Sequence, residues 1–512
     1  MREHTRVFFR SFLLCWLWLL PQQICGQGIQ AGARMEVPEG SLVRVAGSFS
    51  AGAAVGLGGT LCLEGDLIDH TGLHWEQGKL VVDGAGGVQR LGGSTLTQIC
   101  HLEIAAGAKL TLPAGKALTV TGSLVNHNGP ENFHLMTGEG DPATLLHYQP
   151  GVQAMVDRYF PGPSYSWHML SSPVKDHDIR PEFYGPRDSF FGWHEGAQRW
   201  VSIATERLPT FAQTNLDEEV MWPGFGYLVS YRMDEVESIT TSFQGLLNQG
   251  RVAYVLSRKA PEGSSSLGYN LMGNPYPSFI DWDAAEGWEG KTHLQTGASL
   301  ADKQVWIWNE AAGNFGVYSP KARSKGQNGA GPLIPPMTAF WVQAAEGADG
   351  EVLAMDDKVR VHPLAVPEKA GDSLPETGVL RLVVSAVGRP GHDEVVLEFG
   401  HEQAGGAGKF FSPVPGSPQL YTLAGDTPQS IRLLTLPENH QEILLGFIPG
   451  VAGTHRLEVE GCPEMMREWV LADKQTGREA GLSDGKVYDF RAEPGDEATR
   501  FRLKRRLTLE KP

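Results

Sequence analysis

The sequence predicts an all-β protein, built as a short β-solenoid (β-helix-like) followed by two β-sandwich domains. Composition is the first reason, because 63 glycines and 33 prolines weaken helix interiors, while only 20% of the residues are charged. The second is that short apolar runs closed by glycine recur in the first third of the chain. The third is that short alternating strands with frequent turn signals follow them. A helical bundle or long coiled coil is excluded.

Residues 1–26 are predicted to be a signal peptide. Their basic start is followed by an apolar run, 11–20, that is too short to span a bilayer. We expect cleavage after Gly26. Lipidation through Cys25 is the alternative, which the large Ile24 before it disfavours. No later run predicts a transmembrane segment, so the mature chain is expected to be extracellular or at the cell surface.

The charge balance disfavours nucleic acid as a partner. The whole chain carries −16, and removal of residues 1–26 takes away three arginines and one glutamate, leaving −18. Such a chain has no basic surplus to displace counterions from phosphates. Its hydrophobic content of 41%, with 13 Trp, 12 Tyr and 21 Phe, argues against general disorder and for domains with proper cores.

Residues 27–160 are expected to form the solenoid. Val43, Cys62, Val81 and Cys100 stand 19 residues apart along the chain. A period near 20 with alternating apolar residues predicts rungs that stack one inward-facing side chain upon the next. The runs that carry this period include SLVRVAG (41–47), TLCLEG (60–65) and KLVVDG (79–84).

The cysteines are predicted to be thiols that fill such a column. In this register Cys62 and Cys100 lie two rungs apart, at ~9.6 Å, whereas a disulfide needs Cα atoms within about 7 Å. A Cys62–Cys100 bridge is the alternative. With Cys462 the mature chain has three cysteines, too few and too scattered for a zinc site, and we expect neither metal nor cofactor.

Two further domains are expected after the solenoid. Residues 161–365 contain nine of the eleven tryptophans of the mature chain, among short strands and Gly/Pro turns, which predicts a Trp-rich β-sandwich. A polar linker follows at 366–377. Alternating strands resume after it and predict a C-terminal β-sandwich at 378–512.

Trp306, Trp308 and Asn309 are the candidate ligand-binding residues. The two tryptophans alternate at period two, so they face one side of a strand. Paired aromatic rings with an amide beside them suit a sugar, because the rings stack on its apolar face and the amide bonds its hydroxyls. Burial in the core is the alternative. Trp282, in the turn segment NPYPSFIDWD, is expected to be structural.

No credible catalytic set is found. Glu64, Asp66 and Asp69 on the solenoid are carboxylates of the kind that cut polysaccharides, but outward charged residues on rungs are usually just solvated. The GDSL sequence at 371–374 matches a lipase motif, yet it lies in the linker directly before Pro375, not at a strand-to-helix turn.

Two acidic clusters are candidate cation sites. Asp176, His177 and Asp178 are consecutive, as are Asp356 and Asp357. Neither cluster has the glycine-punctuated spacing of a calcium loop, so both are expected to be solvated turns.

Several segments along nearly the whole mature chain carry a resemblance, among them WHMLSSPV (167–174), GYNLMGNPYPSFIDWD (268–283), VWIWNEAAGNFGVY (305–318) and VYDFRAEPGDEATRFRL (487–503). They resemble the exported surface-protein modules of bacteria that use type IX secretion. The resemblance implies a multidomain secreted or outer-surface protein, of the kind associated with adhesion or glycan handling. Such chains usually continue past an RF-x-L motif, here 500–503, into a sorting domain, whereas this one ends at Pro512. Another delivery route, retention in the periplasm, or a missing end are the alternatives.

The function expected from all this is that of a non-catalytic secreted or cell-surface scaffold for adhesion or glycan binding. Its partner would be a surface glycan or a protein ligand. A polysaccharide-degrading lyase or glycosidase that uses the solenoid groove is one alternative. A structural envelope protein that binds protein partners is the other.

Overall fold

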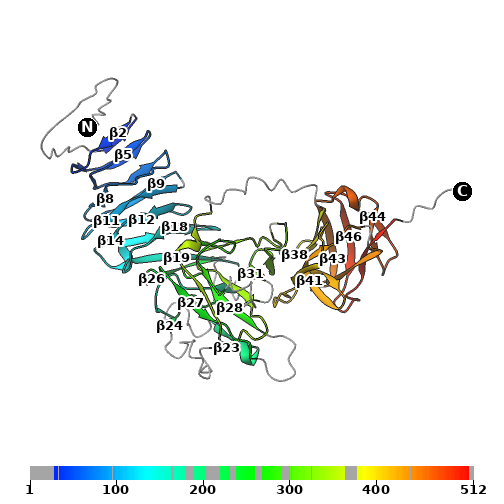
Figure 1. The fold of residues 1–512 in the computed structure, drawn as a ribbon. Helices are drawn as coiled ribbons and strands as arrows, with labels where there is room; N and C mark the ends of the chain where they lie inside the picture. The colour runs from blue at the N-terminus through cyan, green and yellow to red at the C-terminus, as the bar shows by residue number, and fades with distance from the viewer. Residues whose placement is uncertain are drawn as a thin grey trace.

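A computed structural model shows three units in a row along the chain: a solenoid, a central unit and a C-terminal unit (Figure 1). The predicted signal peptide, the linker 366–377 and its GDSL sequence lie outside the described residues. The residues described are 28–32, 34–94, 96–162, 166–179, 189–202, 220–230, 238–259, 268–290, 300, 303–324, 326–363, 378–437 and 440–506.

The predicted solenoid is confirmed: it is a three-sided parallel β-helix of about six turns. One side consists of β1 (Gly28–Ala31), β4 (Ser48–Ala51), β7 (Leu67–Asp69), β9 (Val88–Gly93), β12 (Lys109–Leu112), β15 (Phe133–Leu135) and β19 (Gln153–Pro161). The second consists of β3 (Leu42–Val45), β6 (Thr60–Leu63), β8 (Lys79–Val82), β11 (His101–Ile104) and β14 (Leu124–Asn126). The third holds β2 (Met35–Val37), β5 (Val55–Leu57), β10 (Leu96–Ile99), β13 (Ala117–Val120) and β18 (Thr144–His147).

The register of the rungs differs from the expected column. Cys62 does pair with Val81, but its other neighbour is Arg44, and Val43 pairs with Leu61 instead. Cys100 lies between β10 and β11, outside the column. The prediction failed because the rungs are unequal: paired positions on β3, β6, β8 and β11 are 18, 19 and 22 residues apart. Turns at the corners of a solenoid absorb such insertions.

The cysteines are free thiols, as expected, at all three described positions: Cys62, Cys100 and Cys462. Leu61 and Leu63 on either side of Cys62 point into the solenoid core, so Cys62 points to the outer face of the sheet, where it is nonetheless buried. Burial raises the pKa of its thiol.

The solenoid passes into the central unit without a break at residue 160. Strand β19 pairs antiparallel with β26 (Ser238–Leu246) along its whole length, which covers the open edge of the last rung. Phe160, Phe190 and Phe243 belong to the same buried cluster as Phe133 of the solenoid. The core therefore runs continuously from one unit into the other.

The edge strand β18 is covered in another way. The Arg360 guanidinium donates hydrogen bonds to the backbone carbonyls of His147 (2.7 Å) and Leu145 (3.0 Å). Nearby, the ring of His362 is bonded to the hydroxyls of Thr144 (2.7 Å) and Thr119 (3.0 Å). A buried arginine and histidine thus satisfy the edge of the third solenoid side.

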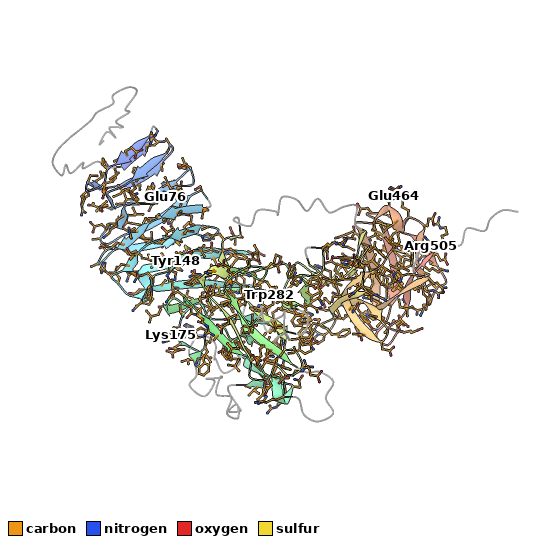
Figure 2. All side chains as sticks on the ribbon, in the orientation of Figure 1. Glu76, Tyr148, Lys175, Trp282, Glu464 and Arg505 are labelled. Atoms are coloured by element: carbon orange, nitrogen blue, oxygen red, sulfur yellow. The ribbon has the colours of Figure 1, made fainter. Side chains whose placement is uncertain are left out.

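The central unit contains two four-stranded antiparallel sheets and smaller ones. Trp282 lies in its interior (Figure 2), fully buried, with its indole N–H bonded to the carbonyl of Lys303 at 2.8 Å, so its structural role is confirmed. The first sheet is β20 (Trp167–Leu170), β25 (Tyr227–Ser230), β22 (Ser189–His194) and β23 (Arg199–Ser202). The second is β28 (Tyr269–Gly273), β34 (Ala339–Gln343), β31 (Val305–Asn309) and β32 (Asn314–Tyr318).

The described part of the C-terminal unit is one eleven-stranded sheet that curls into a near-barrel around a single buried cluster. The all-β fold class is confirmed. The strand order is β45 (Glu479–Gly481), β44 (Trp469–Asp473), β47 (Phe501–Arg505), β42 (Glu442–Ile448), β40 (Gln419–Ala424), β41 (Thr427–Leu434), β38 (His392–Phe399), β37 (Val379–Ala386), β43 (Gly453–Glu460) and β46 (Val487–Ala492), with β39 (Gly405–Gly408) beside β41.

Candidate functional site

An aromatic cleft of about 490 Å³ lies where the central and C-terminal units meet. The first central sheet supplies Trp167, Met169, Phe191, Trp193, Trp200 and Leu228. The second central sheet supplies Tyr269, Phe315 and Trp341, and the segment that follows β39 supplies Phe410, Phe411 and Pro413. A cleft of this size and apolar lining is typical of a small-molecule site.

The alternation of β-strands places these side chains. Trp167 and Met169 are two residues apart on β20, and Phe191 and Trp193 are two apart on β22, so each pair shares a face. Trp193 pairs directly with Trp200 across β22 and β23. Period-two aromatic spacing on consecutive strands thus creates one continuous aromatic surface.

Three tryptophan rings pack edge to face in the cleft wall. The centroids of Trp193 and Trp341 are 5.1 Å apart at 81°, and those of Trp200 and Trp341 are 5.6 Å apart at 76°. Trp193 and Trp200 are 5.4 Å apart at 70°. Such pairs hold one another in place, so the wall is preformed.

The third wall comes from the C-terminal unit. The ring of Phe410 stacks on Trp306 of the central unit at 5.0 Å and also contacts Tyr269 at 4.8 Å. Phe411, next along the chain, is 42% exposed. The cleft is complete only when the two units are docked.

The predicted residues Trp306, Trp308 and Asn309 lie behind the cleft lining. Trp306 is 2% exposed and donates its indole N–H to the carbonyl of Gly408 at 2.9 Å. Trp308 donates to the carbonyl of Trp167 at 3.1 Å. The Asn309 amide is bonded within its own turn region, to the carbonyl of Asn328 and the N–H of Ala312.

The predicted pair therefore supports the rings that line the cleft, and its ligand-binding role stays a prediction. The sequence analysis named residues next to the cleft and missed the residues that line it. The available signals were the period-two aromatics of WHML (167–170) and FFGWH (190–194). No local segment of the sequence indicates that the side chains of these two strands line the same cleft as Phe410.

The cleft offers little hydrogen bonding. Among its described lining residues none is charged. The indole N–H of Trp193 is already bonded to the carbonyl of Tyr269 at 2.7 Å. Trp341 has a buried indole N–H with no hydrogen-bond acceptor in the described structure; the rings of Trp193 and Trp200 stand against it. Burial raises the pKa of Tyr269, so its phenol stays neutral.

The junction beside the cleft is fixed by buried polar contacts. In the central unit, the side-chain amide of Gln327 donates to the carbonyl of Glu394 on β38, and that of Asn328 donates to the carboxylate of Asp393. Asn314 of the central unit donates to the carbonyl of His392 at 2.7 Å. These contacts tie the two units together away from the linker.

The solenoid carboxylates have separate structural partners. Glu64 pairs with Arg44 at 3.3 Å, and Asp66 accepts the backbone N–H of Arg90 at 2.8 Å. Asp69 is fully buried. Although burial alone would raise its pKa, hydrogen bonds from Thr97 and from backbone N–H groups hold the pKa below its usual range.

The two acidic clusters differ in their surroundings. His177 is buried, while Asp176 and Asp178 are exposed. Asp356 caps a 3₁₀ turn by accepting the N–H of Lys358, and Asp357 bonds Gly250 and Arg360. Within the described residues no group of three or more His, Cys, Asp or Glu side chains is suited to hold a metal ion.

Residues 81–315 are similar to a domain of unknown function, DUF8693. This segment spans the later solenoid rungs and central strands that supply much of the cleft, whereas Trp341 and Phe410 lie beyond it. No curated protein and no solved structure matches the chain. Across the described residues, no helix has the length and apolar character needed to cross a membrane.

Proposed function

We propose that this chain is a non-catalytic secreted or cell-surface scaffold that binds a glycan at the aromatic cleft. The observation that carries the proposal is the cleft itself, with a volume of about 490 Å³ and walls of tryptophan and phenylalanine from both units. Flat aromatic faces bind the apolar parts of a glycan, and a preformed wall loses little entropy on binding.

Export is supported by the sequence features of residues 1–26 and by the resemblance to surface modules of type IX secretion bacteria. The rigid junction supports a scaffold role, because buried hydrogen bonds hold the cleft walls in register. A binding site of this kind needs no conformational change to accept its ligand.

The test is calorimetric titration of the mature chain with a panel of soluble oligosaccharides. Phe411→Ala is the informative variant, because this ring lines the cleft yet is 42% exposed, so its loss spares the core. We expect it to weaken binding severalfold. Tyr148→Ala, at a position 47% exposed on the last solenoid turns (Figure 2), is the matched control and should bind like the parent.

Equal weakening by both variants, or no binding by any glycan, would contradict the proposal. Assays of the same panel for new reducing ends or unsaturated products test the non-catalytic part. Release of either product would replace the scaffold by a polysaccharide-degrading enzyme.

A further inference from the structure

We infer that the group that enters the aromatic cleft is an uncharged apolar substituent of the glycan, an acyl or aryl chain, while the sugar stays at the mouth. The inference rests on the proposed function and names the ligand class of the same cleft. It follows from what the walls can and cannot satisfy.

The first step is the hydrogen-bonding capacity of the walls. Among the described lining residues, the indole N–H of Trp193 is committed to the carbonyl of Tyr269, and the buried indole N–H of Trp341 has the rings of Trp193 and Trp200 packed against its ring. Behind the lining, the N–H groups of Trp306 and Trp308 are committed to the carbonyls of Gly408 and Trp167. A sugar ring carries several hydroxyls, each of which loses water on entry and costs free energy unless a protein group replaces it.

The second step is charge. The described lining contains no carboxylate and no basic side chain. A charged ligand group would enter without a counterion, and burial of an unpaired charge is strongly unfavourable. An acyl or aryl chain has neither problem.

The third step is the match between surface and ligand. Met169, Leu228 and Phe315 are buried at the cleft and leave apolar surface for a chain to cover. Phe411 and Pro413 are exposed, so they can contact a sugar outside the interior. Apolar contact contributes about 0.8 kcal/mol per buried methylene, which makes chain length the decisive variable.

The experiment is titration of the mature chain with n-alkyl β-D-glucosides from hexyl to nonyl and with free glucose, all below their micelle concentrations. We expect Kd to fall about fourfold for each added methylene until the cleft is full, which is 0.8 kcal/mol converted at 25 °C. Free glucose should bind too weakly to measure.

Two variants locate the binding. Leu228→Phe adds volume inside the cleft and should make the affinity gain stop at a shorter chain. Leu246→Phe, at a position 40% exposed outside the cleft, is its control and should leave the series unchanged. Phe411→Ala removes only contact at the mouth and should lower all affinities alike.

The outcomes separate the two proposals. Glucosides and panel glycans that bind at the cleft without dependence on chain length would overturn this inference and leave the glycan site standing. A chain-length dependence that Leu228→Phe leaves unchanged would also overturn it, because binding would then be elsewhere. No binding by any glycoside or glycan would overturn both.

Discussion

The ammonium of Lys409 lies 2.5 Å from the carboxylate of Asp393, and both side chains are completely buried at the junction between the central and C-terminal units. Asp393 also accepts the N–H of Leu420 at 2.6 Å and the side-chain amide of Asn328 at 2.8 Å. Because Lys409 directly precedes Phe410, this charge pair anchors the segment that forms the third wall of the cleft.

Lys409→Met should lower the free energy of unfolding by about 3–5 kcal/mol, since it leaves the Asp393 carboxylate buried without its cation. Chemical denaturation measures the change. Lys358→Met, which breaks the exposed pair with Glu286, is the control and should leave the free energy of unfolding nearly unchanged. Similar small losses in both variants would show that the buried pair does not stabilise the junction.

His362 should make the protein less stable in acid. Burial and the neighbouring Arg360 lower the pKa of His362 to about 4, whereas in the unfolded chain the imidazole titrates near 6.5. Between these values the unfolded state binds the extra proton, so stability is complete above about pH 6.5 and falls towards pH 4, by about 3 kcal/mol.

His362→Gln should remove this part of the pH dependence, because glutamine keeps polar contacts to Thr144 and Thr119 but does not titrate. The free energy of unfolding is measured from pH 7.5 to 4. His74→Gln is the control, at a histidine whose side chain is 57% exposed. An identical pH profile for the parent and His362→Gln would contradict the prediction.

Lys116 should have an effect of the same sign in alkaline solution. Its ammonium donates to Thr97 and to the carbonyl of Ser94, both at 2.6 Å, inside the solenoid. Burial lowers the pKa of Lys116 to about 8, against the opposing attraction of Asp69. Between pH 8 and about 10.5 the unfolded chain binds more protons, so stability contributed by this site rises with pH.

The free energy of unfolding of Lys116→Met relative to the parent should therefore drop by about 3 kcal/mol between pH 7.5 and 10.5. Because the other lysines and the tyrosines titrate in both proteins, their contributions cancel when the parent's free energy of unfolding is subtracted from the variant's. Lys109→Met, at an exposed solenoid position, should show a constant difference. A constant difference for Lys116→Met as well would contradict the lowered pKa.

The Arg500 side chain explains the RF-x-L motif structurally. It makes two hydrogen bonds to the buried carboxylate of Asp473, at 2.9 and 2.7 Å, while Phe501 and Leu503 are fully buried in the near-barrel. Arg500→Gln should cost about 3–5 kcal/mol of unfolding free energy. Arg456→Gln, which breaks the exposed pair with Asp489, should leave the free energy of unfolding nearly unchanged in the same assay. Equal costs would refute the structural role.

The candidate site shows which of its features a local sequence pattern can predict. The alternation of Trp306 and Trp308 correctly placed both on one strand face, and both contact the rings around the cleft. Burial and the carbonyls that accept their N–H groups are properties of the folded chain, because Gly408 and Trp167 are each more than a hundred residues away. Local pattern cannot distinguish a ring that lines a cleft from one that supports it.

The sequence by itself determined the all-β class, the solenoid and the strand-rich units after it, because periodicity and glycine placement act over a few residues. Tertiary structure decided the register of Cys62 against Arg44, where unequal turns shift the rungs. It also decided the cleft, since Trp193, Trp341 and Phe410 meet only through the docking of three separate chain segments. Contacts between distant segments depend on packing and buried charge pairs, which no local pattern encodes.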